Sequence, residues 1–72
     1  MKQTYVHGYK VQYEDNAYPG IYHLQTDLDT KQSNVFFNEA RARHTAPFED
    51  DNEHHFILTH NSDGSYLLER KS

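Results

Sequence analysis

The sequence contains no cysteine and no long apolar segment. Without cysteine there is no disulfide and no thiolate ligand for zinc, so side-chain packing must stabilise the fold. No apolar run approaches the roughly 18 residues that a membrane-spanning helix needs, and residues 1–5 lack the apolar stretch of a signal peptide. We therefore expect a cytoplasmic protein that does not enter membranes.

Basic residues and glycines are also scarce. The chain has seven lysines and arginines, never more than two in a row, against 11 aspartates and glutamates, which gives a formal net charge of −4. Binding to duplex nucleic acid is not expected, because such proteins present a basic surface to the phosphates. The three glycines, Gly8, Gly20 and Gly64, stand apart and so form no phosphate-binding loop.

Large aliphatic residues are few, but tyrosines compensate for them. Leu, Ile, Val and Phe make up 14 of the 72 residues, about 19%, close to the rough 20% limit below which chains tend to be disordered. Six tyrosines raise the number of large side chains available to a core to 20, and a charge of −4 is too small to keep the chain extended. We expect a single small domain over residues 1–72.

Alternating side chains in the first third of the chain predict a β-hairpin. Residues 4–13 and 21–28 both alternate, with Tyr9, Val11 and Tyr13 on one face of the first segment and Tyr22, Leu24 and Leu28 on one face of the second. Residues 14–20 between them are rich in turn formers. Keeping the apolar faces together fixes the register, because a slip of one residue would exchange the faces. The expected pairs are Val11 with Leu24 and Tyr13 with Tyr22.

A helix is predicted from about residue 29 to residue 44. Asp29 or Thr30 can cap it, with Gln32 completing a capping box, and the segment contains neither glycine nor proline. Residues 45–53 are expected to form a loop, because Pro47 lacks a backbone donor and the acidic residues that follow repel one another.

Residues 54–68 predict a second hairpin. The turn chemistry of residues 61–65, with Gly64 in the left-handed region, pairs Leu58 with Leu68 and His60 with Tyr66. The apolar residues of both strands then share one face. The expected fold is α+β, with two β-hairpins separated by one helix (ββαββ) and a four-stranded sheet that carries the helix on one face.

No catalytic residue, metal site or cofactor is predicted. His60, Ser62 and Asp63 are the residue types of a hydrolytic triad, but they occupy one tight turn where Ser and Asp have structural roles. Of the six histidines, His54 and His55 are adjacent and would point to opposite faces of a strand. Only a cluster formed by distant segments would bind a metal ion.

The favoured hypothesis is a non-enzymatic protein-interaction module that acts as a regulator or inhibitor. Its binding site is expected in the acidic loop, with one aromatic anchor surrounded by charges: Phe48, Glu49, Asp50, Asp51 and Glu53. Phe48 folded back into the core is the alternative for that residue. The partner is an unidentified protein, and a homodimer through an edge strand or the tyrosine-rich surface stays open.

A single-stranded nucleic-acid-binding protein is the alternative function. Tyr5, Tyr9 and Tyr13 would lie on one face of the first strand and stack on unpaired bases. The same tyrosines could instead form the core, where they would compensate for the scarce aliphatic residues.

Overall fold

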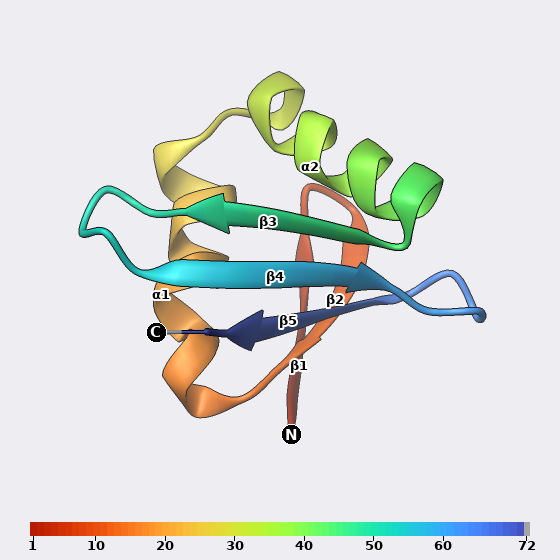
Figure 1. Cartoon of the computed structure of the whole chain (residues 1–72), viewed down its shortest axis with the longest axis horizontal. Helices are drawn as coiled ribbons and strands as arrows, with labels where there is room; N and C mark the ends of the chain where they lie inside the picture. Colours follow the sequence, from red (N-terminus) through yellow and green to blue (C-terminus); the bar gives the residue numbers. More distant parts are fainter. Residues whose placement is uncertain (72) are drawn as a thin grey trace.

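Residues 1–71 are described by a computed structural model, in which five strands form one sheet and helical segments pack against it (Figure 1). The elements are β1 (Lys2–Val6), β2 (Tyr9–Tyr13), the 3₁₀ turn η1 (Asp15–Ala17), α1 (Tyr18–Tyr22), the π-helical turn η2 (His23–Asp27), α2 (Thr30–Arg43), β3 (Thr45–Glu49), β4 (His55–His60) and β5 (Tyr66–Arg70). The fold is α+β, as predicted. The predicted ββαββ order with four strands is wrong in detail, because a fifth strand and a further helix are present in residues 1–71.

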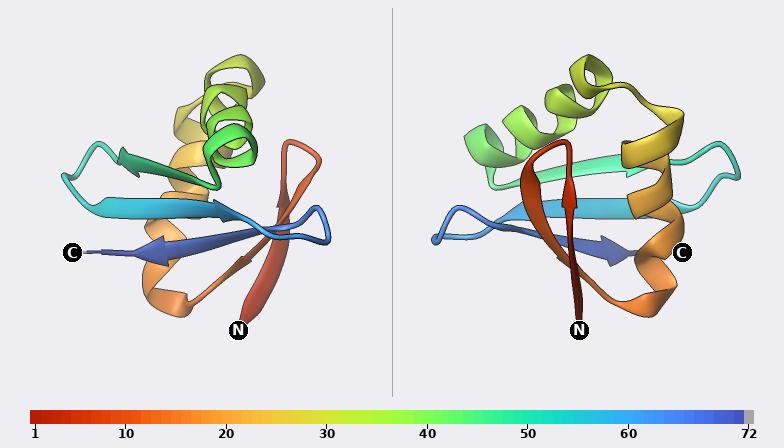
Figure 2. Two further views of the ribbon diagram at one scale, coloured as in Figure 1. Left: turned by 45° about the vertical axis from the view of Figure 1, so that its right-hand side comes forward. Right: turned by 180° about the vertical axis from the view of Figure 1, so that it is seen from behind.

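The strand at the centre of the sheet is β5. The strand order is β1-β2-β5-β4-β3, with β5 parallel to β2 and antiparallel to β4. Val11 of β2 pairs with Tyr66 of β5, so the N-terminal hairpin is joined directly to the C-terminal strands. The β1–β2 hairpin crosses the other three strands steeply in each view, which reflects a strong sheet twist (Figure 2).

The predicted strand over residues 4–13 is two strands with a tight turn between them. His7 and Gly8 both have positive φ, 51° and 88°, as a type I′ hairpin turn requires. Tyr5 pairs with Lys10 across this hairpin and therefore does not share a face with Tyr9. The prediction missed the turn because alternation continues through it and His7 precedes Gly8 in place of the Asn or Asp that is typical of such turns.

The second predicted strand, over residues 21–28, is helical, so its pairs with β2 do not exist. Ala17, Ile21 and Leu24 recur at helical spacing and are all buried, and this periodicity prevails over the alternation of apolar residues. Pro19 stands in the first turn of α1, where its missing N–H costs no hydrogen bond.

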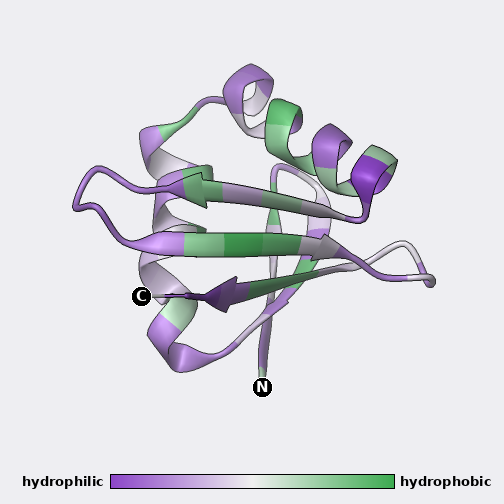
Figure 3. Cartoon of the chain, viewed as in Figure 1, coloured by the Kyte–Doolittle hydropathy of each residue, from purple (hydrophilic) through white to green (hydrophobic). Residues whose placement is uncertain are grey.

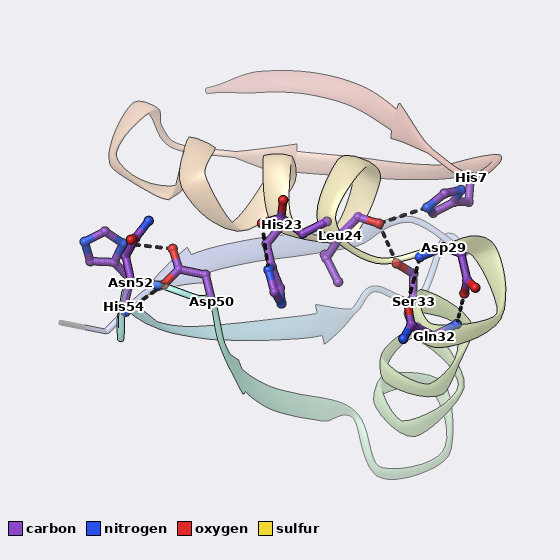
Figure 4. Close-up of polar contacts among 10 residues, drawn as sticks. His7, His23, Leu24, Asp29, Gln32, Ser33, Asp50, Asn52 and His54 are labelled. Atoms are coloured by element: carbon purple, nitrogen blue, oxygen red, sulfur yellow. Dashed lines mark hydrogen bonds and ion pairs between the residues drawn. The ribbon is translucent and has the colours of Figure 1, made fainter.

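The structure confirms the predicted helix and the predicted C-terminal hairpin. Asp29 caps α2 in a capping box with Gln32 (Figure 4). Strands β4 and β5 pair in the predicted register, Leu58 with Leu68, and Gly64 has the expected positive φ of 92°.

The predicted loop over residues 45–53 is partly wrong, since residues 45–49 form strand β3 at the edge of the sheet. Proline is tolerated on an edge strand, where one side of the backbone needs no partner, and Pro47 occupies an exposed position. Ala46 and Phe48 alternate with it and are buried.

The core lies between the sheet and the helices. Helix α1 crosses one face of the sheet, while α2 packs beside β3 and β4 (Figures 1 and 2). The most deeply buried large side chains are Phe37, Phe56, Ile21, Leu24, Leu58, Leu68, Val6 and Val11. Colouring by hydropathy shows the apolar centre of β4 and the hydrophilic loop that precedes it (Figure 3). No helix in residues 1–71 is long and apolar enough to cross a membrane.

Candidate functional site

The β3–β4 loop, residues 50–54, meets the turn η2 at one end of the molecule. A ring nitrogen of His23 and carboxylate oxygens of Asp27 and Asp51 lie within 4.8 Å of one another, although the loop and the turn are distant in sequence. Four exposed carboxylates of this region, Asp27, Glu49, Asp51 and Glu53, make up the acidic end of the molecule.

Asp50 is buried and holds the loop in shape. Its carboxylate accepts hydrogen bonds from the backbone N–H groups of Asn52, at 3.0 Å, and His54, at 2.8 Å. Nδ1 of His54 donates to the same carboxylate at 2.8 Å (Figure 4). Burial raises the pKa of the Asp50 carboxyl, but the hydrogen bonds from His54 and Asn52 outweigh burial and hold the pKa below its usual range. Asp50 therefore has a structural role.

The other carboxylates of the predicted site are exposed. Glu49 lies at the end of β3, and its carboxylate is 3.3 Å from Nδ1 of His55 on the neighbouring strand. Glu53 has a positive φ of 65°, which is uncommon for glutamate, and its N–H donates to the Asp50 carbonyl at 3.3 Å. Asp50 thus orders a loop from which Glu49, Asp51 and Glu53 project into solvent.

Phe48, the predicted anchor, is 8% exposed and belongs to the core. Its ring stacks on Phe56 with centroids 5.4 Å apart and packs at 5.2 Å against Phe36. The imidazole of His23 also stacks on the phenyl ring of Phe48, with ring centroids 6.1 Å apart and the two planes nearly parallel. Phe48 therefore supports the acidic end from inside the protein and does not present its ring at the surface.

His23 is the residue of this region that sequence reasoning missed. It is 6% exposed, and its Nδ1 lies 3.1 Å from a carboxylate oxygen of Asp27, one helical turn later. In a strand these two residues would be about 13 Å apart, so the expected strand concealed their contact. A helical interpretation of residues 21–28 would have revealed it, because positions i and i+4 are neighbours on a helix.

The chemistry of the acidic end has to be inferred from this chain itself. No protein-family model, curated protein or solved structure matches it. The arrangement combines three features, namely a loop ordered by a buried carboxylate, several exposed negative charges and one buried imidazole beside two carboxylates. These features permit the binding of cations, either as basic side chains or as metal ions.

The three tyrosines of the alternative nucleic-acid site do not share one surface. Tyr9 stacks on Phe37 with centroids 4.1 Å apart, and Tyr13 is 8% exposed. Tyr5 is 61% exposed and lies on the other face of the β1–β2 hairpin. A base-stacking platform would therefore have to be built on Tyr5 without the other two rings.

His60 is the last residue of β4, and Ser62 and Asp63 lie in the turn between β4 and β5. Asp63 has a structural role in this turn. One oxygen of its carboxylate accepts hydrogen bonds from the Ser65 hydroxyl, at 2.6 Å, and the Ser65 N–H, at 2.9 Å. These bonds hold the pKa of the Asp63 carboxyl below its usual range. The ring of His60 instead packs edge-on against Tyr66.

Proposed function

We propose that this protein is a non-enzymatic protein-interaction module, a regulator or inhibitor, whose acidic end binds a basic segment of a partner protein. The proposal is supported by the organisation of the β3–β4 loop, in which Asp50 makes the internal hydrogen bonds while Asp51 and Glu53 stay exposed, next to the exposed Glu49 at the end of β3. A loop ordered before binding loses less conformational entropy when a partner docks.

Charge supports a basic partner. The chain carries a net charge of −4, and the carboxylates Glu49 and Asp27 have histidines as neighbours at 3.3 Å and 3.1 Å. Each exposed ion pair with a partner is worth only about 0.2 to 1 kcal/mol, so recognition needs several carboxylates acting together. The contact is expected to form fast and to weaken as salt increases.

The proposal is tested with a fluorescein-labelled octapeptide of alternating arginine and serine, using fluorescence anisotropy at low and high salt. We expect saturable binding that weakens with salt. The triple variant Glu49→Gln/Asp51→Asn/Glu53→Gln should weaken binding about tenfold, since three exposed pairs together are worth about 1.4 kcal/mol.

A matched variant separates a specific site from general charge attraction. Glu14→Gln/Asp15→Asn/Glu69→Gln also removes three exposed carboxylates, all outside the β3–β4 loop. It should retain affinity within about threefold, the difference expected from net charge alone. Equal weakening by both triple variants would show that the peptide responds only to overall charge, and the proposed site would be wrong.

The edge strand β1 is the surface best suited to the homodimer considered from the sequence. A two-residue turn makes Val6 and Tyr9 a hydrogen-bonded pair, so the alternating residues Gln3 and Tyr5 direct their backbone N–H and C=O groups away from β2. The opposite edge, β3, carries Pro47, which discourages strand addition. Sedimentation equilibrium should show a dimer that Gln3→Pro abolishes, whereas a wild-type monomer at every concentration would exclude this assembly.

A further inference from the structure

We propose that His23, Asp27 and Asp51 form a binding site for a divalent transition-metal ion such as Zn²⁺. One ligand atom from each residue lies within 4.8 Å of the other two. The site goes beyond the proposed partner contact and does not depend on it, since it requires the buried imidazole of His23 in addition to negative charge.

Two of the three ligands already have the spacing that an ion requires. Nδ1 of His23 lies 3.1 Å from Oδ2 of Asp27. Ligands held at 2.0–2.1 Å from a tetrahedral zinc ion are about 3.3 Å apart, so the distance between these two atoms is already close to the one that the ion requires. On binding, the ion takes the place of the hydrogen on Nδ1, and the neutral ring carries its proton on Nε2.

The surroundings fix the imidazole and leave the third ligand free to approach. The His23 side chain is 8% exposed and stacks on Phe48, and the η2 turn sets its position relative to Asp27. π-Helical turns are rare and are often found at functional sites. Asp51 is exposed on the β3–β4 loop, and its carboxylate oxygen is within 4.8 Å of the other two ligand atoms. A change of side-chain rotamer can supply the approach of at most about 1.5 Å that brings it to the ligand spacing of about 3.3 Å.

The type of ligand indicates which ions bind. An imidazole with two carboxylates suits Zn²⁺, Ni²⁺ or Cu²⁺ better than Mg²⁺ or Ca²⁺, which prefer oxygen ligands alone. Three protein ligands leave at least one coordination position for water or for a group of another molecule.

The test is calorimetric titration of Zn²⁺ into the 72-residue chain after EDTA treatment and removal of the EDTA, with ¹H–¹⁵N spectra recorded in parallel. We expect one equivalent to bind and the signals of His23, Asp27 and Asp51 to shift. Mg²⁺ should not reproduce these shifts.

Two exposed positions of the same loop provide a matched pair of variants. Asp51→Asn removes a proposed ligand, whereas Glu53→Gln removes an equal charge outside the cluster. Asp51→Asn should weaken Zn²⁺ binding about tenfold or more, and Glu53→Gln should change it by less than about twofold. Because both residues are exposed, neither variant is expected to unfold the protein.

Other results would overturn the proposal. These are equal weakening by the two variants, spectral shifts confined to other histidines, or no binding below 1 mM Zn²⁺, a threshold on the order of the weakest protein metal sites. Because His23 is buried, His23→Gln serves only as a further check, interpreted after its amide spectrum shows the native fold.

Discussion

The absence of a side chain at Gly20 allows α1 to approach the sheet closely. A Cβ at this position would lie 2.9 Å from Cδ1 of Phe56 and 3.0 Å from Cδ2 of Leu68. Alanine favours helices over glycine by about 1 kcal/mol, but overpacking a core costs about 1 to 3 kcal/mol. Gly20→Ala should therefore lower the free energy of unfolding, measured by urea denaturation. An increased urea midpoint would show that α1 can move away from β4 and β5 without cost.

Asp63 makes stability depend on pH. Its folded-state pKa is lowered by the hydrogen bonds from Ser65, so its ionised form stabilises the fold at neutral pH. This contribution is complete above the ordinary aspartate pKa and is lost as the pH falls from about 4 through the lower folded-state value.

The corresponding measurement compares the wild type with Asp63→Asn in urea at pH 7 and pH 2.5. The variant should be less stable at pH 7, and the difference should shrink at pH 2.5, which lies below the ordinary aspartate pKa, because the unfolded-state carboxyl is then protonated. In a Ser65→Ala background, which lacks the hydroxyl donor, the pH dependence of this difference should be smaller. A difference independent of pH would assign the effect of Asp63→Asn to the turn backbone instead of to charge.

At the scale of elements, local signals were sufficient in two places. The capping box of Asp29 and Gln32 and the turn around Gly64 both act within five residues, and both were predicted correctly. The strand predicted over residues 21–28 was wrong because alternation and helical spacing coexist there, and the burial of Ala17, Ile21 and Leu24 at helical spacing favours the helix. Strand β3 was missed because Pro47 excludes a central strand but tolerates an edge.

The acidic end could be predicted only in part. The acidic residues of the β3–β4 loop are evident in the sequence, and the exposure of Glu49, Asp51 and Glu53 agrees with a surface loop. The buried role of Asp50 depends on hydrogen bonds from the loop backbone. The proximity of Asp51 to His23 arises from tertiary packing, which no local pattern encodes.

Strand β3 depends on Phe48. Phe48→Ala should lower the free energy of unfolding by about 3 to 5 kcal/mol, because it removes a ring that packs against Phe36, Phe56 and His23. The neighbouring variant Pro47→Ala is the control, since Pro47 is exposed on the same strand. It should change stability by no more than about 0.5 kcal/mol. A similar small loss for Phe48→Ala, measured by urea denaturation, would show that the ring is not part of the core.

At the scale of the whole molecule, β5 couples the two halves of the chain. It lies between β2 and β4, so without β5 the β1–β2 hairpin and the β3–β4 pair would not be joined in one sheet. Unfolding in urea should therefore be a single transition, with coincident curves from far-ultraviolet circular dichroism and from the near-ultraviolet signal of the buried residues Tyr13 and Tyr66. Loss of the tyrosine signal at lower urea would mean that the packing around these two tyrosines is lost before the secondary structure.

The parallel pairing of β2 with β5 also sets the order of events on the ribosome. Val11 of β2 pairs with Tyr66, so the strand that completes the sheet beside β2 is translated 55 positions later. Until then the nascent chain can form the β1–β2 hairpin and α2, but the edges of β2 and β4 that will receive β5 have no partner. Synthesis proceeds at about 5 to 20 residues per second, so the edge of β2 stays open for about 3 to 11 seconds in every round of translation, whereas the edge of β4 waits for no more than about 2 seconds. The nascent chain is therefore most exposed to strand pairing with other chains during this interval.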